Sequence, residues 1–241
     1  MVFDLMQLFP QLPLTTLVPA WFYLFSGLIY LVVGIVSFLV SYFSFKLFRI
    51  TSSKLHLVLS ISFLLIGIAF GIITASSLYT YQNPESVMKI VDLNTDAYNI
   101  YYMLSIIAYL LLVIINLPKG KGSKLYTFVP VWFINSPNFH MTSILLLLYV
   151  AAKSVSNFFK IKSEESFLVM FAFLMIALSH IFIFLIPFGI ELYLVAHVFL
   201  LAGFLSLLAM LVRVTRNDRE KDQGRDSVRY LEDSPAGEWQ S

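Results

Sequence analysis

The sequence predicts an all-α fold, in which about seven helices cross a lipid bilayer as one bundle. Hydrophobic residues make up 59% of the 241 residues and charged residues only 12%, about half of the fraction in a soluble domain. Apolar runs of about 18 residues or more recur along the chain, and a helix of that length crosses a hydrocarbon core about 30 Å thick. Helices also satisfy their own backbone hydrogen bonds, as lipid requires. These observations predict a multi-pass protein of the cell membrane.

Six of the predicted spans are long apolar runs. The last two form a hairpin over residues 166–216, which turns at Phe188 and Gly189. In chain order, the other four cover residues 21–45, 56–79, 98–117 and 141–159.

Residues 125–139 decide between seven spans and six. They are apolar, but the run is short and is broken by Pro130 and Pro137. We interpret them as a short, proline-bent fourth span, which gives seven spans. A re-entrant or interfacial segment, which gives six, is the alternative.

Lysine and arginine predict the orientation of the chain. The loops after the first, third and fifth spans and the C-terminal tail carry all but one of the 16 Lys and Arg residues. The opposite side keeps Lys89, together with acidic residues such as Asp92 and Glu191. Because Lys and Arg are enriched in cytoplasmic loops, we expect the N-terminus outside and the C-terminus inside.

With seven spans, the first three and the last three follow the same course through the membrane, and the fourth links them. This 3+1+3 plan predicts a parallel repeat with a pseudo-two-fold axis along the membrane normal. One gapless alignment of the two halves, which we call the repeat alignment, supports it with several identities. Val40, Ser44, Phe48, Ser53, Phe63, Leu64 and Ile66 fall on Val150, Ser154, Phe158, Ser163, Phe173, Leu174 and Ile176.

The two ends of the chain differ from the apolar bundle, residues 21–216. Residues 1–20 carry prolines and no basic cluster, so we expect an interfacial segment and no cleavable signal peptide. Residues 217–241 are polar and of mixed charge, and they bury too little apolar surface to offset the entropy of folding. We therefore expect a disordered cytoplasmic tail beyond a helical extension of the last span, too short to form an output domain.

The hairpin carries the main candidate for a binding site, which is the histidine pair His180 and His197. Each lies eight residues from the turn, so at about 1.5 Å per residue both lie about 12 Å below it. Ionisable residues within membrane spans are functional candidates by default. Tyr193 and Phe204 share the helix face of His197, and Phe173 shares that of His180. These five residues predict an apolar pocket with one or two polar groups.

Three interpretations of the histidine pair stay open. Each imidazole donates a hydrogen bond to a neighbouring group and so packs the hairpin. Alternatively, the pair binds a small ligand or a proton, or it ligates a b-type haem or a metal ion. Two haems are disfavoured, because the other two histidines, His56 and His140, are expected at the membrane edges.

No catalytic residues are predicted, and we do not expect an enzyme. The chain has no cysteine, which excludes disulfides and thiolate metal sites. No Asp or Glu falls near the middle of a predicted span, and no phosphate-binding glycine loop or H-E-x-x-H motif occurs. The basic loops are too small to bind nucleic acid. The expected partners are the lipid bilayer and a membrane or cytoplasmic protein.

Two resemblances add to this interpretation. Residues 37–71 and the hairpin motifs SHIF and LVAHVFLLAGFLSLLAMLVRV resemble uncharacterised seven-helix membrane proteins of archaea, whose arrangement is similar to that of membrane sensor modules. The 3+1+3 plan and the external N-terminus are similar to those of the SWEET and PQ-loop transporters. Where those transporters carry a Pro-Gln pair, this chain has Val40-Ser41 and Val150-Ala151, so no site residues are carried over.

We therefore expect a sensing or binding module, or an accessory subunit, with its pocket beside His180 and His197. A facilitative transporter of a small solute is the second hypothesis. A membrane redox subunit with a single haem is the third.

Overall fold

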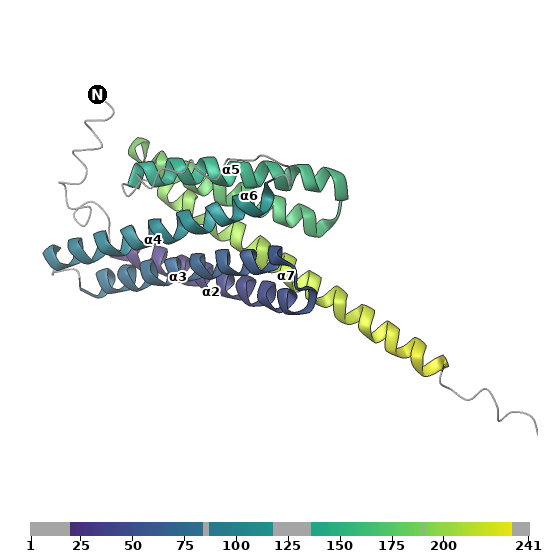
Figure 1. The fold of residues 1–241 in the computed structure, drawn as a ribbon. Coiled ribbons are helices and arrows are strands. Elements are labelled where there is room, and N and C mark those ends of the chain that lie inside the picture. The colour runs from purple at the N-terminus through teal and green to yellow at the C-terminus, as the bar shows by residue number, and fades with distance from the viewer. Residues whose placement is uncertain (1–19, 84–86, 118–135, 190, 233–241) are drawn as a thin grey trace, which may run out of the picture.

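The computed structural model describes residues 20–83, 87–117, 136–189 and 191–232, which form six long helices and one short 3-10 turn (Figure 1). The first three helices are α2 (Ala20–Thr51), α3 (Lys54–Gln82) and α4 (Val87–Asn116). The others are α5 (Ser136–Ile161), α6 (Glu164–Phe184) and α7 (Glu191–Glu232), with the turn η3 (Ile186–Phe188) before α7.

All six of these helices are long and apolar enough to cross a membrane. Large apolar side chains lie on the outside of the bundle: Ile35, Leu145 and Val198 are each more than half exposed, at 52%, 64% and 58%. Lipid is a favourable solvent for such a surface, whereas water is not. The all-helical architecture and the apolar surface fit an integral membrane protein.

The six helices pack in chain order into a closed ring. Each helix packs against the next one along the chain, and α7 returns to pack against α2. The helices of each three-helix unit are antiparallel to their neighbours in that unit. We call α2–α4 the first unit and α5–α7 the second unit.

The two units meet at helices that run parallel, and the first such pair is α4 and α5. Tyr102 stacks on Phe139 with ring centroids 4.3 Å apart. Further along both helices, Tyr149 donates a hydrogen bond of 3.3 Å to the carbonyl oxygen of Asn116. Because residue numbers rise together along the contact, α4 and α5 point the same way, as Figure 1 shows.

The second parallel pair is α2 and α7. Phe22 contacts Tyr193 with ring centroids 5.7 Å apart, and deeper in the bundle Tyr30 contacts His197 at 5.1 Å. Helices α2, α4, α5 and α7 therefore share one direction, and α3 and α6 run opposite to them (Figure 1).

The corner between α2 and α3 recurs at the equivalent place in the second unit, between α5 and α6. The residue after each first helix has a positive φ angle, 52° at Ser52 and 53° at Lys162. The next residue, Ser53 or Ser163, is the N-cap of the following helix. The repeat alignment therefore lays one corner on the other, including the helix ends.

Basic side chains gather at the end of the bundle that holds these two corners. Arg49 lies in the last turn of α2, and Lys160 in the last turn of α5. Arg213 of α7 forms ion pairs at the same end with Glu164 and Glu165 of α6. We call this end of the bundle the basic end.

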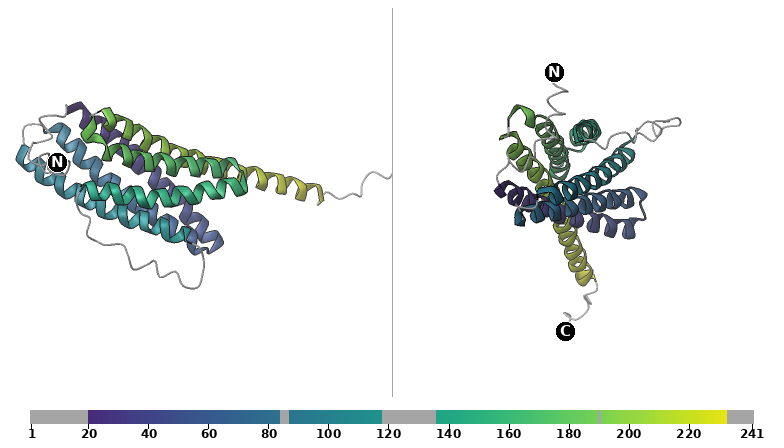
Figure 2. Two further views of the ribbon diagram at one scale, coloured as in Figure 1. Left: turned by 90° about the horizontal axis from the view of Figure 1, so that it is seen from above. Right: turned by 90° about the vertical axis from the view of Figure 1, so that its left-hand side faces the viewer.

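Two boundaries differ from the sequence prediction. Helix α5 begins at Ser136, so the last residues of the predicted fourth span belong to its first turn, where Pro137 is tolerated. The rest of that predicted span lies outside the described residues. Helix α7 continues to Glu232, into residues predicted as a disordered tail (Figure 2). The frequent Arg, Glu, Lys and Gln residues there favour a helix.

Aromatic rings fill the centre of the bundle. Phe70 of α3 is fully buried and contacts the rings of Tyr30, Tyr101 and Phe204 with centroids 5.6, 5.3 and 5.9 Å apart. Tyr101 in turn contacts Phe139 of α5 at 5.5 Å. The two units are thus joined through a continuous set of buried rings, which contribute apolar area and favourable tilted ring contacts.

Candidate functional site

A buried hydrogen-bonded chain joins three helices in the interior of the bundle. In α6, Nε2 of His180 lies 3.2 Å from the hydroxyl oxygen of Tyr109 in α4. The other ring nitrogen, Nδ1, lies 3.0 Å from Nδ1 of His140 in α5. Tyr109 and His180 are each 1% exposed and His140 is 7% exposed. We call these three residues the His180 cluster.

Hydrogen-bond chemistry allows two arrangements of protons in this cluster. A neutral imidazole has one N–H donor and one acceptor nitrogen, so one Nδ1 donates and the other accepts. If His140 donates, His180 donates from Nε2 to the oxygen of Tyr109. If His180 donates from Nδ1, its Nε2 accepts from the Tyr109 hydroxyl. The cluster can therefore reverse its polarity while its heavy atoms stay in place.

His197 of α7 belongs to a second cluster, on the contact between α7 and α2. Its Nδ1 lies 2.7 Å from the carbonyl oxygen of Tyr193, and its Nε2 lies 2.9 Å from the hydroxyl of Tyr30. A carbonyl oxygen only accepts, so Nδ1 carries the proton, and neutral His197 accepts from Tyr30 at Nε2. We call Tyr30, Tyr193 and His197 the His197 cluster.

The packing of the hairpin explains why its two histidines have different partners. At Gly203, α7 approaches α6 so closely that a Cβ atom would lie 2.7 Å from Cγ1 of Ile176. Ser206, one turn further along, donates a hydrogen bond of 2.9 Å to a carbonyl oxygen of α6. This face of α7 packs on α6, whereas His197 faces α2 and His180 faces α4 and α5. The pocket predicted between the two histidine faces is therefore replaced by two separate clusters.

The other three predicted site residues, Tyr193, Phe204 and Phe173, lie in different parts of the bundle. Tyr193 lies beside His197, with ring centroids 4.2 Å apart. Phe204 packs on Phe70 in the centre of the bundle, and Phe173 is buried in the hydrophobic core. The five predicted side chains thus lie in different surroundings, Tyr193 with His197, Phe204 with Phe70, and His180 with Tyr109 and His140.

The histidines of the second unit take the places of aromatic residues in the first unit. In the repeat alignment, His140 falls on Tyr30 and His180 falls on Phe70. Tyr30 and Phe70 are in contact, with ring centroids 5.6 Å apart, and His140 and His180 are in contact at 5.3 Å. The same pair of positions is thus used twice, once with a Tyr–Phe pair and once with two imidazoles.

The sequence places His140 at a membrane edge, and in the structure it is the third residue of the apolar span Asn138–Ile161. What the sequence does not indicate is that its side chain is buried. Because α5 begins before the predicted span, His140 lies within the helix and faces the bundle interior. The repeat alignment pointed to a buried position for His140. It aligns His140 with Tyr30, which lies well inside the first predicted span.

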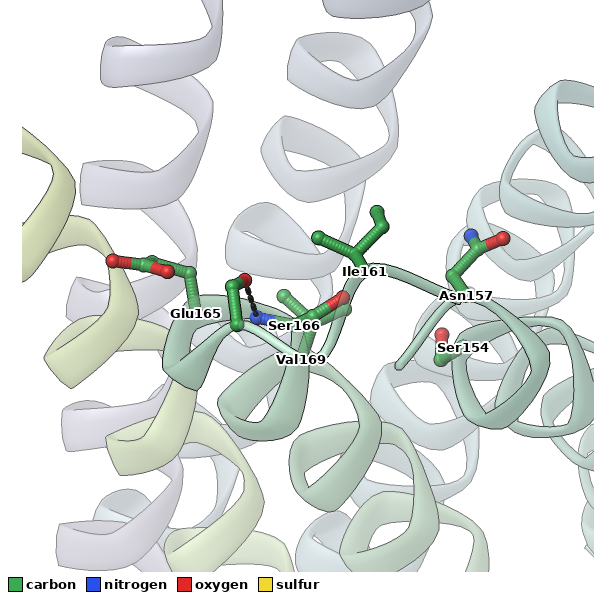
Figure 3. Close-up of a pocket in the computed structure, with 7 residues that line it drawn as sticks. Ser154, Asn157, Ile161, Glu165, Ser166 and Val169 are labelled. Carbon is green, nitrogen blue, oxygen red and sulfur yellow. Dashed lines mark hydrogen bonds between the residues drawn. The ribbon is translucent and has the colours of Figure 1, made fainter. Parts of the chain in front are cut away.

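A pocket of about 260 Å³ lies at the basic end, beside the corner between α5 and α6 (Figure 3). Several of its polar groups already serve the local fold. The Ser163 hydroxyl accepts a hydrogen bond of 3.1 Å from the backbone N–H of Ser166, and Ser154 donates to a carbonyl oxygen of its own helix. The full lining consists of Ser154, Asn157, Ile161, Ser163, Glu165, Ser166 and Val169.

The histidine pair of the sequence prediction fits haem or metal ligation poorly. His180 and His197 each use both ring nitrogens in hydrogen bonds, so a ligand bond would have to replace one of these. Within the described ranges, no group of three or more His, Cys, Asp or Glu side chains comes together. His140 and His180 offer two nitrogen donors, whereas a zinc site takes at least three protein ligands.

The His180 cluster and the His197 cluster each join the two units by a hydrogen bond between buried side chains of the described residues. No protein-family model, no curated protein and no solved structure matches this chain.

Proposed function

We propose that this protein is a facilitative transporter of a small solute, in which the two three-helix units move against each other. The observation that carries the proposal is that each cluster bridges the two units. Tyr109 of the first unit meets His180 of the second, and Tyr30 of the first unit meets His197 of the second. Hydrogen bonds at such positions can break and re-form as the units separate and close.

The pairing of the helices supports a two-fold relation between the units. Exchanging α2 with α5, α3 with α6 and α4 with α7 converts every major helix contact into another one. A pseudo-two-fold axis along the membrane normal has this effect. In transporters with parallel repeats, the substrate site lies at the interface of the repeats near the middle of the membrane. Both clusters lie at the interface of the two units, toward the end of the bundle opposite the basic end.

The seven-span plan belongs to the same proposal. Because α4 and α5 run parallel, Asn116 at the end of α4 and Ser136 at the start of α5 lie at opposite ends of the bundle. A fourth span between them returns the chain, whereas the six-span alternative needs both residues at one end. The basic end then faces the cytoplasm, with the N-terminus outside.

Uptake into liposomes tests this proposal. The purified protein is reconstituted, and uptake of radiolabelled sugars, amino acids and polyols is compared with uptake into liposomes without protein. We expect at least one solute to enter faster with the protein and to leave again when the gradient is reversed. Failure of every solute class to cross faster than in bare liposomes counts against transport.

A variant that gives the second unit the aromatic residues of the first unit tests the role of the His180 cluster. Tyr109 contacts His180 at 5.7 Å, as Phe204 contacts Phe70 at 5.9 Å. The triple variant Tyr109→Phe, His140→Tyr, His180→Phe therefore copies the aromatic set that the bundle already uses on the symmetric side. We expect it to fold and to lose uptake. Undiminished uptake would show that the His180 cluster plays no part in transport.

A sensing module is the second candidate, and the length of α7 favours it. This helix runs without a break from Glu191, at the end opposite the basic end, to Glu232. A change in the bundle can thus be passed to residues beyond it. A solute that raises the thermal unfolding midpoint without crossing the liposome membrane would select sensing over transport.

A further inference from the structure

Among the residues that the structure describes, two serine hydroxyls in the bundle interior lack a hydrogen-bond partner. Ser105 of α4 and Ser143 of α5 are both 0% exposed, and within the described part of the chain nothing hydrogen-bonds to either Oγ atom. The hydroxyl of Tyr101, one turn before Ser105, interacts with it but without the geometry of a hydrogen bond. Buried polar groups are nearly always satisfied, by protein or by a bound molecule. Two unsatisfied hydroxyls therefore require an explanation.

Ser105 and Ser143 lie at similar positions along the bundle axis, because α4 and α5 run parallel and are in contact one turn before the two serines. Tyr102 contacts His140 across this pair of helices, with ring centroids 6.1 Å apart. Three residues further along each helix, on the same side, come Ser105 and Ser143. By this register, both buried serines fall on the helix sides that carry Tyr102 and His140, one turn nearer the basic end than His140.

The surroundings of this serine pair are aromatic and uncharged. Tyr101 and Phe139, whose rings touch, precede the two serines by one turn on their own helices. Tyr109, of the His180 cluster, follows Ser105 by one turn. The buried polar residues of the described bundle are all Ser, Thr or His, so no buried Asp, Glu, Lys or Arg is available to neutralise an ion.

We infer that Ser105 and Ser143 together bind an uncharged hydroxyl group, which is that of the transported solute or of a water molecule. This inference rests on the transport function proposed above. A serine hydroxyl both donates and accepts, and so does the hydroxyl of an alcohol, a polyol or water. Aromatic walls suit the carbon atoms of such a solute, and the absence of charge disfavours ions. The pair lies between the two units, where their separation would expose it.

Glycerol and water permeability of reconstituted liposomes tests the inference, with stopped-flow light scattering as the measurement. Ser105→Ala, Ser143→Ala and the double variant are compared with Ser37→Ala. Ser37 is the matched control, because it is also 0% exposed but already donates a hydrogen bond of 2.8 Å to the Val33 carbonyl oxygen.

We expect each single variant to lower glycerol permeability by about tenfold, as the loss of one hydrogen bond to the solute predicts. The double variant should lose little more than either single variant, because one molecule contacts both hydroxyls. Ser37→Ala should match the wild type. A change in water permeability alone assigns the pair to water. Glycerol and water permeabilities unchanged by both serine variants overturn the inference, although the transport proposal stands if the wild type still moves a solute.

Thermal unfolding in detergent separates a failure of the site from a failure of transport. If the hydroxyls hold a bound molecule, Ser105→Ala and Ser143→Ala lower the unfolding midpoint, and their effects are not additive. If the hydroxyls are merely unpaired, alanine removes a buried unsatisfied group and raises the midpoint. A wild type that moves no solute, combined with lowered and non-additive midpoints, rejects transport but retains binding of water. Raised midpoints reject the binding site itself.

Discussion

The tautomer of His197 is set by its two hydrogen-bond partners. The carbonyl of Tyr193 can only accept, so the hydroxyl of Tyr30 is left as the donor to Nε2. His180 has no such constraint, because its partners are a hydroxyl and a second imidazole, each of which can donate or accept. One histidine therefore holds a fixed contact between the units, and the other an adaptable one.

The Tyr30→Phe variant tests the fixed contact. It leaves the acceptor nitrogen of buried His197 without its donor, so the free energy of unfolding should fall by about 1–3 kcal/mol. Tyr42→Phe is the control, because Tyr42 is 62% exposed, and its change should stay within about 0.5 kcal/mol. Denaturant titration in detergent micelles measures both. Equal effects of the two substitutions would contradict the assignment of this bond.

The sequence was most informative where a residue lies within a long apolar run. Helical periodicity placed Tyr193 on the face of His197, and the two are in contact. It did not indicate the burial of His140, because two prolines obscured the start of α5 and His140 fell just outside the predicted span. The prediction also paired His180 with His197, because both lie at the same distance from one turn. That distance does not say which neighbouring helix each side chain contacts. That choice depends on the close approach at Gly203, which is a tertiary effect.

The two corners at the basic end use the same backbone device. Ser52 and Lys162 each hold a left-handed conformation directly after a helix, where glycine is the preferred residue. A side chain in this conformation costs free energy, because Cβ approaches the following carbonyl oxygen. Both units keep this cost at the same position of the corner.

Glycine at these positions should stabilise the protein. We expect Ser52→Gly and Lys162→Gly each to raise the free energy of unfolding by about 0.5–1 kcal/mol, after the extra entropy of the unfolded chain is included. Ser156→Gly, at an exposed position inside α5, should lower it by about 0.5 kcal/mol. The measurement is again denaturant titration. A loss of stability at both corners would mean that their left-handed geometry is wrong.

At the scale of whole elements, helix positions followed from hydropathy but helix neighbours did not. The apolar runs located all six described helices, and the turn at Gly189 lies where it was predicted. The parallel contacts of α4 with α5 and of α2 with α7 are non-local, and no pattern within one helix specifies them. The distribution of Lys and Arg was the sequence feature that favoured parallel units, because it places the basic ends of both units on one side.

The course of the whole chain through the membrane is the prediction that organises the others. The chain has no cysteine, so single cysteines can be introduced and labelled without background. We expect a membrane-impermeant maleimide to reach Asn138→Cys from outside intact cells, and Ser52→Cys and Lys160→Cys only after permeabilisation. All three positions are exposed. Labelling of Asn138→Cys and Lys160→Cys from the same side would exclude the parallel arrangement of the units.

Function was the least predictable property of the molecule. Hydropathy and charge determine how a chain lies in lipid, and most residues of this sequence serve that purpose. Two polar features of the described bundle stand out: two imidazoles where the first unit has a Tyr–Phe pair, and two serine hydroxyls, one in each unit, that have no hydrogen-bond partner among the described residues. Their meaning depends on which residues of different helices meet, and that information is not contained in the periodicity of any one span.

The unbroken course of α7 carries it beyond its contacts with α6. Ser206 and Arg213 still bind α6, and from Arg213 to its end at Glu232 the helix extends about 28 Å at about 1.5 Å per residue. A tilt of about 5° around Arg213 would move the far tip by about 2.5 Å. A small rotation of the bundle would thus become a larger displacement at the far end of this helix.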